Sequence, residues 1–168
     1  FLTRLHSAPV SQLRRLVDVE LEPLEQWLGY TRSDYLKMVR SIPPAVRRPI
    51  ESFLAAAVPE ANFAPAFCHN DLGAEHVLVD SDSRACTGIL DWTDAAITDP
   101  ARDFGRLYRD CGPTVVDAAL AGYDAGPGLR ERAIFYGRCA VFEDIAHGLE
   151  TGKRVYAENA IAALGWLF

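Results

Sequence analysis

The residues best suited to chemistry lie in segment 67–80, FCHNDLGAEHVLVD, where two histidines, three acids and an asparagine stand between apolar residues. A further carboxylate, Asp91, lies near the end of the short segment TGILDW at 87–92. Carboxylates that converge repel one another unless a cation or a proton-transfer task stabilises them. Phosphoryl transfer uses such a set: one aspartate accepts the hydroxyl proton, while a second aspartate and a neutral ligand hold magnesium against the nucleotide phosphates.

A predicted β-hairpin would bring these groups together. Segments 76–80 and 87–92 are short, rich in β-branched residues and separated by the turn-forming SDSRAC, which is typical of two antiparallel strands. His76 begins the first strand and Asp91 ends the second, so strand pairing places both at the open end of the hairpin. Asp71 lies in the loop that enters it, within reach of both.

The rest of the chain is predicted to be mainly helical. Apolar periodicity, with prolines and glycines as boundaries, predicts helices over 10–28, 32–40, 44–58, 100–109, 114–123, 129–148 and 153–167. Ser33 is expected to cap the second of these helices, and Pro49 to kink the third. With no repeat or internal linker in the sequence, we expect one mainly α domain that holds one small hairpin.

Composition narrows the classes of partner. A chain of 168 residues with 49% hydrophobic residues fits a single domain with a real core. The net charge of -6 argues against nucleic acid as a partner and suits a cationic small substrate. Four cysteines without CxxC spacing indicate free thiols in a reducing compartment, so we expect a cytoplasmic protein. No apolar run is long enough to span a membrane, and no membrane partner is expected.

At these residues the sequence resembles the aminoglycoside phosphotransferase family, small-molecule kinases built like protein kinases. The resemblance is carried by CHNDLGAEHVLVD followed by GILDWTDAAITDPARDF. The usual loop of that family is HxDxxxxN, and His76 stands here in place of its asparagine, as in the similar HND…H loop of the branch acting on the 2''-hydroxyl of aminoglycosides. The resemblance is strong over 66–110 and returns in FEDIAHGLETG at 142–152.

This resemblance implies a role for each residue of the cluster. Asp71 would be the catalytic base, and Asp91 and His76 would be ligands of Mg²⁺, with ATP or GTP as phosphate donor. His69 would brace the loop, and Asp103 would tie the following helix back to it.

The resemblance also implies a fold and a domain. Residues 1–168 would form the helical C-terminal lobe of a protein-kinase-like fold, with the catalytic loop and hairpin at 66–92. A kinase also needs a phosphate-covering loop and a lysine in a strand-rich N-terminal lobe. No such loop is present here, and Lys37 and Lys153 both fall in predicted helices. We therefore expect the chain, which begins FLTRLHSAPV without Met, to be one lobe of a larger protein and a poor catalyst alone.

The substrate pocket resembles the family less closely than the catalytic loop does. In the 2''-acting branch, acids in the turn after the DF helix receive the substrate amines. The corresponding YRDCGP at 108–113 offers Asp110, which Arg109 opposes. Asp94 is a second candidate for substrate binding, and Trp166 is the candidate to replace a tryptophan of that branch. The expected substrate is therefore a hydroxylated, cationic small molecule rather than a named antibiotic.

Other polar residues have simpler interpretations. Asp99 before Pro100 is typical of a helix N-cap with proline at the first helical position, and Glu75 has no assigned role. Surface, solvated-face or helix-packing positions are expected for His6, His147, Glu143 and Asp144.

Three other functions compete with a kinase for antibiotics. A metabolite kinase of the choline or amino-sugar type would share the loop but not the pocket. A dinuclear metal hydrolase needs more ligand blocks than four histidines supply. A catalytically inactive kinase-like binding module is the third, because the asparagine is replaced and no N-terminal lobe is present.

Overall fold

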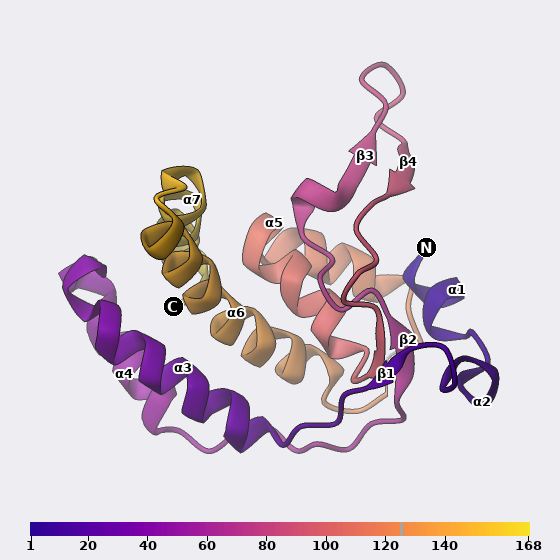
Figure 1. Cartoon of the computed structure of the whole chain (residues 1–168), viewed down its shortest axis with the longest axis horizontal. Helices are drawn as coiled ribbons and strands as arrows, with labels where there is room; N and C mark the ends of the chain where they lie inside the picture. The colour runs from indigo at the N-terminus through magenta and orange to yellow at the C-terminus, as the bar shows by residue number, and fades with distance from the viewer. Residues whose placement is uncertain (125) are drawn as a thin grey trace.

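Long helices make up most of the molecule (Figure 1). The computed structural model describes residues 1–124 and 126–168. Three helices in its C-terminal part, α5 (Ala101–Ala121), α6 (Leu129–Thr151) and α7 (Arg154–Leu167), pack on one another. Helix α3 (Leu24–Met38) packs against α6 and is joined to α4 (Pro44–Ala55) by the 3-10 turn η1 (Val39–Ser41). The predicted mainly α fold is confirmed.

The core lies between these helices, and α6 runs through its middle. About half of the residues of α6 are buried, among them Phe142 and Ile145. Fully buried residues from its neighbours complete the core, including Ile50, Phe104, Leu164 and Leu167. Gly105 and Gly137 allow α5 and α6 to approach closely. A Cβ atom at Gly105 would lie 2.8 Å from the Tyr136 Cβ, so no larger residue fits there. This close contact fixes the face of α5 that carries the candidate site.

A small three-stranded sheet supports the loop of interest. Its order is β1 (Asp18–Val19), β5 (Ala96–Thr98) and β2 (Ala66–Cys68), with β1 parallel and β2 antiparallel to the buried central strand. The short helices α1 (Leu2–His6) and α2 (Val10–Leu13) lie beside β2. None of these strands was predicted, since each has only two or three residues and carries no alternation that a pattern could reveal.

The predicted hairpin is confirmed. Strands β3 (Val77–Val79) and β4 (Cys86–Ile89) pair antiparallel with Val77 opposite Ile89, after the 3-10 turn η2 (Ala74–His76). The hairpin projects from the helical body (Figure 1), and its strands are largely exposed. Its base therefore joins the core, while its tip extends into solvent.

The predicted helix over 10–28 is wrong in its middle, and the predicted helix over 32–40 is helical but begins earlier, at Leu24. Residues 18–19 pair with β5 instead, and this tertiary pairing overrides the apolar periodicity of the segment. Pro23 precedes α3, which continues without a break past Ser33, so Ser33 lies inside a helix and caps nothing.

The later helices agree better with their predictions. Pro44 opens α4, and Pro49 lies inside it. The segments 100–109 and 114–123 form one element, α5, interrupted where Gly112 adopts a φ of 76° at the predicted Gly–Pro boundary. Of the helices in the described part of the chain, none combines the length and apolarity that crossing a bilayer requires.

Candidate active site

Unusual backbone conformations flank the candidate base. Asp71 follows Asn70, whose φ is 72°, and Asp91 across the site has a φ of 56°. Few side chains adopt left-handed backbone, and asparagine and aspartate tolerate it best. Backbone of this kind concentrates at functional sites, where the surrounding structure maintains it. The backbone of the loop, and not only its side chains, therefore indicates a functional site.

A buried carboxylate on α5 holds the loop that carries the candidate base. Asp103 Oδ1 accepts a hydrogen bond from the Asn70 N–H at 2.7 Å, and its Oδ2 accepts one from the His69 N–H at 3.0 Å. The His69 ring lies 2.8 Å from the Leu90 carbonyl through Nε2 and accepts from the Asp71 N–H through Nδ1. Both His69 and Asp103 are fully buried. These bonds connect α5, the loop and the end of the hairpin.

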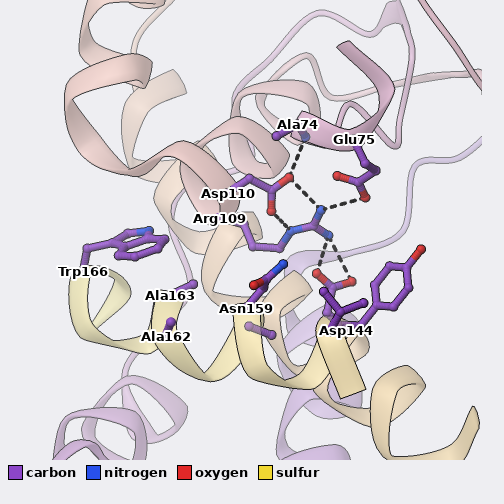
Figure 2. Close-up of a pocket in the computed structure, with 12 residues that line it drawn as sticks. Ala74, Glu75, Arg109, Asp110, Asp144, Asn159, Ala162, Ala163 and Trp166 are labelled. Atoms are coloured by element: carbon purple, nitrogen blue, oxygen red, sulfur yellow. Dashed lines mark hydrogen bonds and ion pairs between the residues drawn. The ribbon is translucent and has the colours of Figure 1, made fainter. Parts of the chain in front are cut away.

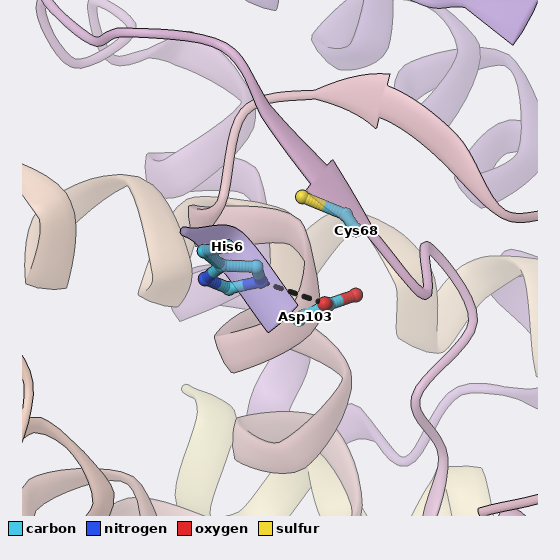
Figure 3. Close-up of side chains that lie close together, drawn as sticks. All are labelled: His6, Cys68 and Asp103. Carbon is cyan, nitrogen blue, oxygen red and sulfur yellow. Dashed lines mark hydrogen bonds and ion pairs between the residues drawn. The ribbon is translucent and has the colours of Figure 1, made fainter. Parts of the chain in front are cut away.

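His6 reaches the same carboxylate from α1 (Figure 3). Its Nε2 lies 2.9 Å from Asp103 Oδ2, and its Nδ1 lies 2.9 Å from the Tyr123 hydroxyl. The expectation of a surface or simple packing position for His6 misses these contacts. Cys68 completes a group whose ligand atoms lie within 4.8 Å of one another. Burial raises the pKa of its thiol well above the ordinary value, and both His6 nitrogens have protein partners. The group is therefore a hydrogen-bonded support and not a metal site.

His76 and Asp91 form a donor pair that fits a divalent cation. His76 Nδ1 lies 2.8 Å from the Asp71 carbonyl oxygen, so Nδ1 carries the proton and Nε2 keeps a free lone pair. That Nε2 lies 3.9 Å from Asp91 Oδ2, a gap that one ion with bonds of about 2.1 Å can bridge. Thr93 donates to the other Asp91 oxygen at 2.8 Å, and this hydrogen bond lowers the pKa of Asp91.

A cation from α5 lies beside the candidate base. Arg106 Nε is 3.4 Å from Asp71 Oδ1, and Arg106 Nη1 is 2.9 Å from Glu143 Oε2 on α6. The loop residues 72–74 that follow Asp71 carry no charge. The positive charge at this carboxylate therefore comes from a residue far along the chain, which the sequence did not single out.

A pocket of about 460 Å³ opens next to the loop (Figure 2). The loop, α5, α6 and α7 all contribute to its wall, which includes Ala74, Glu75, Arg109, Asp110, Asp144, Tyr156, Asn159 and Trp166. We call it the α5–α7 pocket. It contains Asp110, which was predicted for substrate binding, and Trp166, the candidate to replace a tryptophan of the related branch. Asp94 does not line it: its side chain is exposed, and its carbonyl accepts a hydrogen bond from Asn70.

Arg109 organises the charges of this pocket. Its side chain is only 3% exposed and makes ion pairs with Asp110, Asp144 and, at 3.7 Å, Glu75. Burial alone lowers the pKa of Arg109, but the hydrogen bond to Asp110 and the nearby carboxylates outweigh it and raise the pKa. Burial also raises the pKa of Asp144 to about 6, and the nearby charges of Arg109 and Arg106 offset this only in part. Asp144 was expected on a solvated helix face, and that expectation is wrong.

Asp99 stabilises the start of α5, the helix that carries Asp103. Its Oδ1 accepts from the Ala101 N–H at 3.0 Å, as a capping carboxylate does, but α5 begins one residue later than predicted, with Pro100 at its N-cap position. Its Oδ2 also pairs with Arg132 of α6 at 2.7 Å, and both side chains are buried. This buried pair fixes the start of α5 against α6, and hence the position of Asp103.

Comparison with known proteins places the chain in a family. The model described as "Phosphotransferase enzyme family" matches residues 1–136. The chain belongs to this family. Among curated relatives, viomycin phosphotransferase of Streptomyces vinaceus is 30% identical over 114 residues, which are 66% of this chain and 39% of that protein. The uncharacterized protein YcbJ of Bacillus subtilis (strain 168) is 40% identical over 102 residues, 58% of this chain and 33% of that protein. The chain thus covers well under half of these relatives.

Solved structures share the fold of this family member. The GDP complex of aminoglycoside 2'-phosphotransferase-IIIa has a TM-score of 0.71 at 22% identity, over 98% of this chain and 57% of that one. Macrolide 2'-phosphotransferase type I has a TM-score of 0.61 at 21% identity, over 97% and 56%. The fold is that of the C-terminal lobe of a kinase-like protein, as predicted. At this level of identity, the likeness concerns the fold alone.

Sequence reasoning missed several residues of this phosphotransferase-family site. Glu75 and Asp144 line the pocket, and Arg106 lies beside Asp71. They were missed because charged residues are common on turns and helix surfaces, so their residue types alone do not mark them as part of a site. The sequence did offer one signal of a charged pocket. Arg109 and Asp110 are adjacent in YRDCGP, the segment at 108–113 that follows Asp103. The contribution of His6 left no such signal, because it depends on how α1 folds back beside β2.

Proposed function

We propose that this chain is the catalytic and substrate-binding lobe of a small-molecule kinase. It would transfer the γ-phosphate of ATP or GTP to a hydroxyl of an aminoglycoside-like compound. The observation that carries the proposal is the adjacency of loop and pocket. Asp71, His76 and Asp91 gather at the base of the hairpin, and Ala74 and Glu75 of the same loop line the α5–α7 pocket. A molecule held in that pocket would lie beside the loop that carries the proposed base.

Each group has a step to perform. Asp71 would orient the acceptor hydroxyl and accept its proton, while Asp103 and His69 keep the loop backbone in place. His76 Nε2 and Asp91 would hold Mg²⁺, which when bound neutralises charge on the nucleotide phosphates. Arg106, 3.4 Å from Asp71, would hold the orientation of that carboxylate, and its positive charge would stabilise negative charge that develops beside the base.

The remaining parts of a kinase would come from outside this chain. A phosphate-covering loop and a lysine are required for nucleotide binding, and the described residues of this chain supply neither in a strand-rich setting. Its structural neighbours are longer, since the chain covers 57% of the aminoglycoside 2'-phosphotransferase. We infer that a strand-rich N-terminal lobe precedes this one and that the separate lobe is inactive. We also infer that the protein is cytoplasmic, where nucleotide triphosphates are available.

The substrate class follows from the pocket and the relatives. Relatives are named for viomycin, aminoglycosides, macrolides and spectinomycin. The pocket presents three carboxylates and the aromatic rings of Tyr156 and Trp166, which suits a hydroxylated compound that carries amines. Such an activity would fit antibiotic resistance. A metabolite kinase of the amino-sugar or choline type is the second candidate, because Arg109 neutralises part of the acidic wall.

Phosphate transfer by the full-length protein tests this proposal. Labelled ATP and GTP are offered with Mg²⁺ to a panel of aminoglycosides, viomycin, amino sugars and choline. We expect transfer to at least one acceptor and loss of Mg²⁺-dependent nucleotide binding in Asp91→Ala. Asp82→Ala, which changes an exposed aspartate at the hairpin tip, serves as the matched control. Absence of transfer to every acceptor, together with no Mg²⁺–nucleotide binding, would contradict the proposal.

A further inference from the structure

Arg109 is a basic residue built into the wall of an otherwise acidic pocket (Figure 2). Its guanidinium lies between Asp110 and Asp144, with Glu75 beside it. The side chain is almost completely buried, so the cation is a permanent part of the pocket. A substrate amine would therefore compete with Arg109 for these carboxylates, most of all for Asp110.

The hydrogen bonds show which carboxylates remain available. Asp110 uses both oxygens: Oδ1 accepts from Arg109 Nε at 2.5 Å, and Oδ2 accepts from Arg109 Nη2 at 3.0 Å and from the Ala74 N–H at 2.8 Å. Asp144 meets only the Nη1 of Arg109, at 3.0 and 3.2 Å. Glu75 is 45% exposed and lies 3.7 Å from Arg109. Glu75 and Asp144 therefore keep acceptor capacity that Asp110 has lost.

We propose that Arg109 is a specificity-determining residue that takes the place of one substrate amine at Asp110. The pocket would then accept a substrate that presents a single amine to Glu75 and Asp144, with its ring or apolar part toward Trp166. A second ammonium group would lie close to the guanidinium, and like charges held together in an interface oppose binding strongly. This inference rests on the proposed function in taking the α5–α7 pocket as the acceptor site.

Equilibrium binding to the full-length protein without nucleotide tests the inference. The probes are glucosamine, which carries one amine, and kanamycin, which carries several. In Arg109→Met, which keeps a long side chain without its charge, we expect the ratio of the kanamycin Kd to the glucosamine Kd to fall by about tenfold or more. Arg109→Lys keeps the charge and should keep the parent ratio. An unchanged ratio in a folded Arg109→Met protein would overturn the inference, as would no binding of either probe to any variant.

A second variant covers the case in which Arg109→Met does not fold, because removing one partner of a buried ion pair is strongly destabilising. Glu75→Gln changes a half-exposed residue and should weaken glucosamine binding by about tenfold. Glu150→Gln, at an exposed position on α6 outside the pocket, is its matched control and should leave binding unchanged. Equal glucosamine affinity in Glu75→Gln and the parent would contradict the inference.

Failure of this inference can be told apart from failure of the proposed function. Amine binding is measured without nucleotide, whereas the kinase proposal is measured by phosphate transfer. If phosphate is transferred but the ratio of the kanamycin Kd to the glucosamine Kd is unchanged in Arg109→Met, only the proposed role of Arg109 is contradicted. If the ratio changes as expected but no phosphate is transferred, only the proposal that the protein is a kinase is contradicted.

Discussion

The loop that carries the candidate base and the α5–α7 pocket are each organised by one buried charged residue of α5, but in different ways. Asp103 holds the loop through backbone N–H groups, which every loop residue except proline can supply. Arg109 holds the pocket through side-chain carboxylates, which change whenever the sequence changes. The comparison suggests that the loop can keep its geometry while the pocket diverges. We therefore expect the reaction to depend on the first region and specificity on the second.

The largest effect is expected from removing the support of the loop. In Asp103→Ala, two buried backbone N–H groups and His6 lose their acceptor. We expect the free energy of unfolding to fall by about 3–5 kcal/mol, since each buried group left unpaired is costly. Urea titration of the full-length protein measures this change.

The matched control lies on the same helix. Asp117 is an exposed aspartate of α5 that pairs with Arg130 at 2.8 Å. Exposed ion pairs contribute little to stability, so Asp117→Ala should unfold close to the parent midpoint. Equal losses of stability in Asp103→Ala and Asp117→Ala would refute the claim that Asp103 supports the loop.

A smaller effect is expected where the two regions meet. Arg106→Gln removes the cation 3.4 Å from Asp71 and should lower kcat by about tenfold with little change in nucleotide affinity. Steady-state kinetics with the best acceptor measure this change. Arg130→Gln, which alters an exposed arginine of α6, should leave kcat unchanged. A kcat in Arg106→Gln equal to that of the parent would show that this ion pair has no part in the reaction.

The smallest expected effect is the pH dependence of cation binding in the pocket. Arg109, Asp110 and Glu75 face Asp144, whose pKa is raised by burial to about 6. Below pH 6 its carboxyl carries a proton and does not attract a cation, whereas above pH 6 it is ionised. Binding of choline, whose charge is independent of pH, should therefore tighten severalfold between pH 5 and pH 7.

The variant Asp144→Asn sharpens this test. It cannot ionise, so its choline affinity should change less with pH than that of the parent. Titration calorimetry at several pH values gives the comparison. The same pH dependence in both proteins would assign the titration to another group.

The proximity of the candidate catalytic residues could be predicted from the sequence because they are close along the chain. Asp71, His76 and Asp91 lie within 21 residues, and hairpin pairing alone brings the last two together. The fold class followed from long apolar periodicities and from glycine and proline boundaries. Short strands such as β1 and β5 could not be predicted, because they exist only through their pairing with each other and with β2.

The pocket could be predicted only in outline. Glu75, Arg109, Asp144 and Trp166 come from four different elements or loops and meet only when α5, α6 and α7 pack. Periodicity placed Asp144 on a solvated face because it cannot show that an arginine of another helix lies opposite. His6 was missed for the same reason, since its partner Asp103 is 97 residues away.

The most direct test of the account is single-turnover phosphate transfer by the full-length protein carrying Asp71→Asn, beside Asp82→Asn as control. Asparagine keeps the shape of the side chain but cannot accept the hydroxyl proton. The account predicts that Asp71→Asn slows transfer by about a hundredfold or more while nucleotide and acceptor still bind, and that Asp82→Asn transfers at the parent rate. Transfer by Asp71→Asn at the parent rate would contradict the assignment of the base and, with it, the central claim.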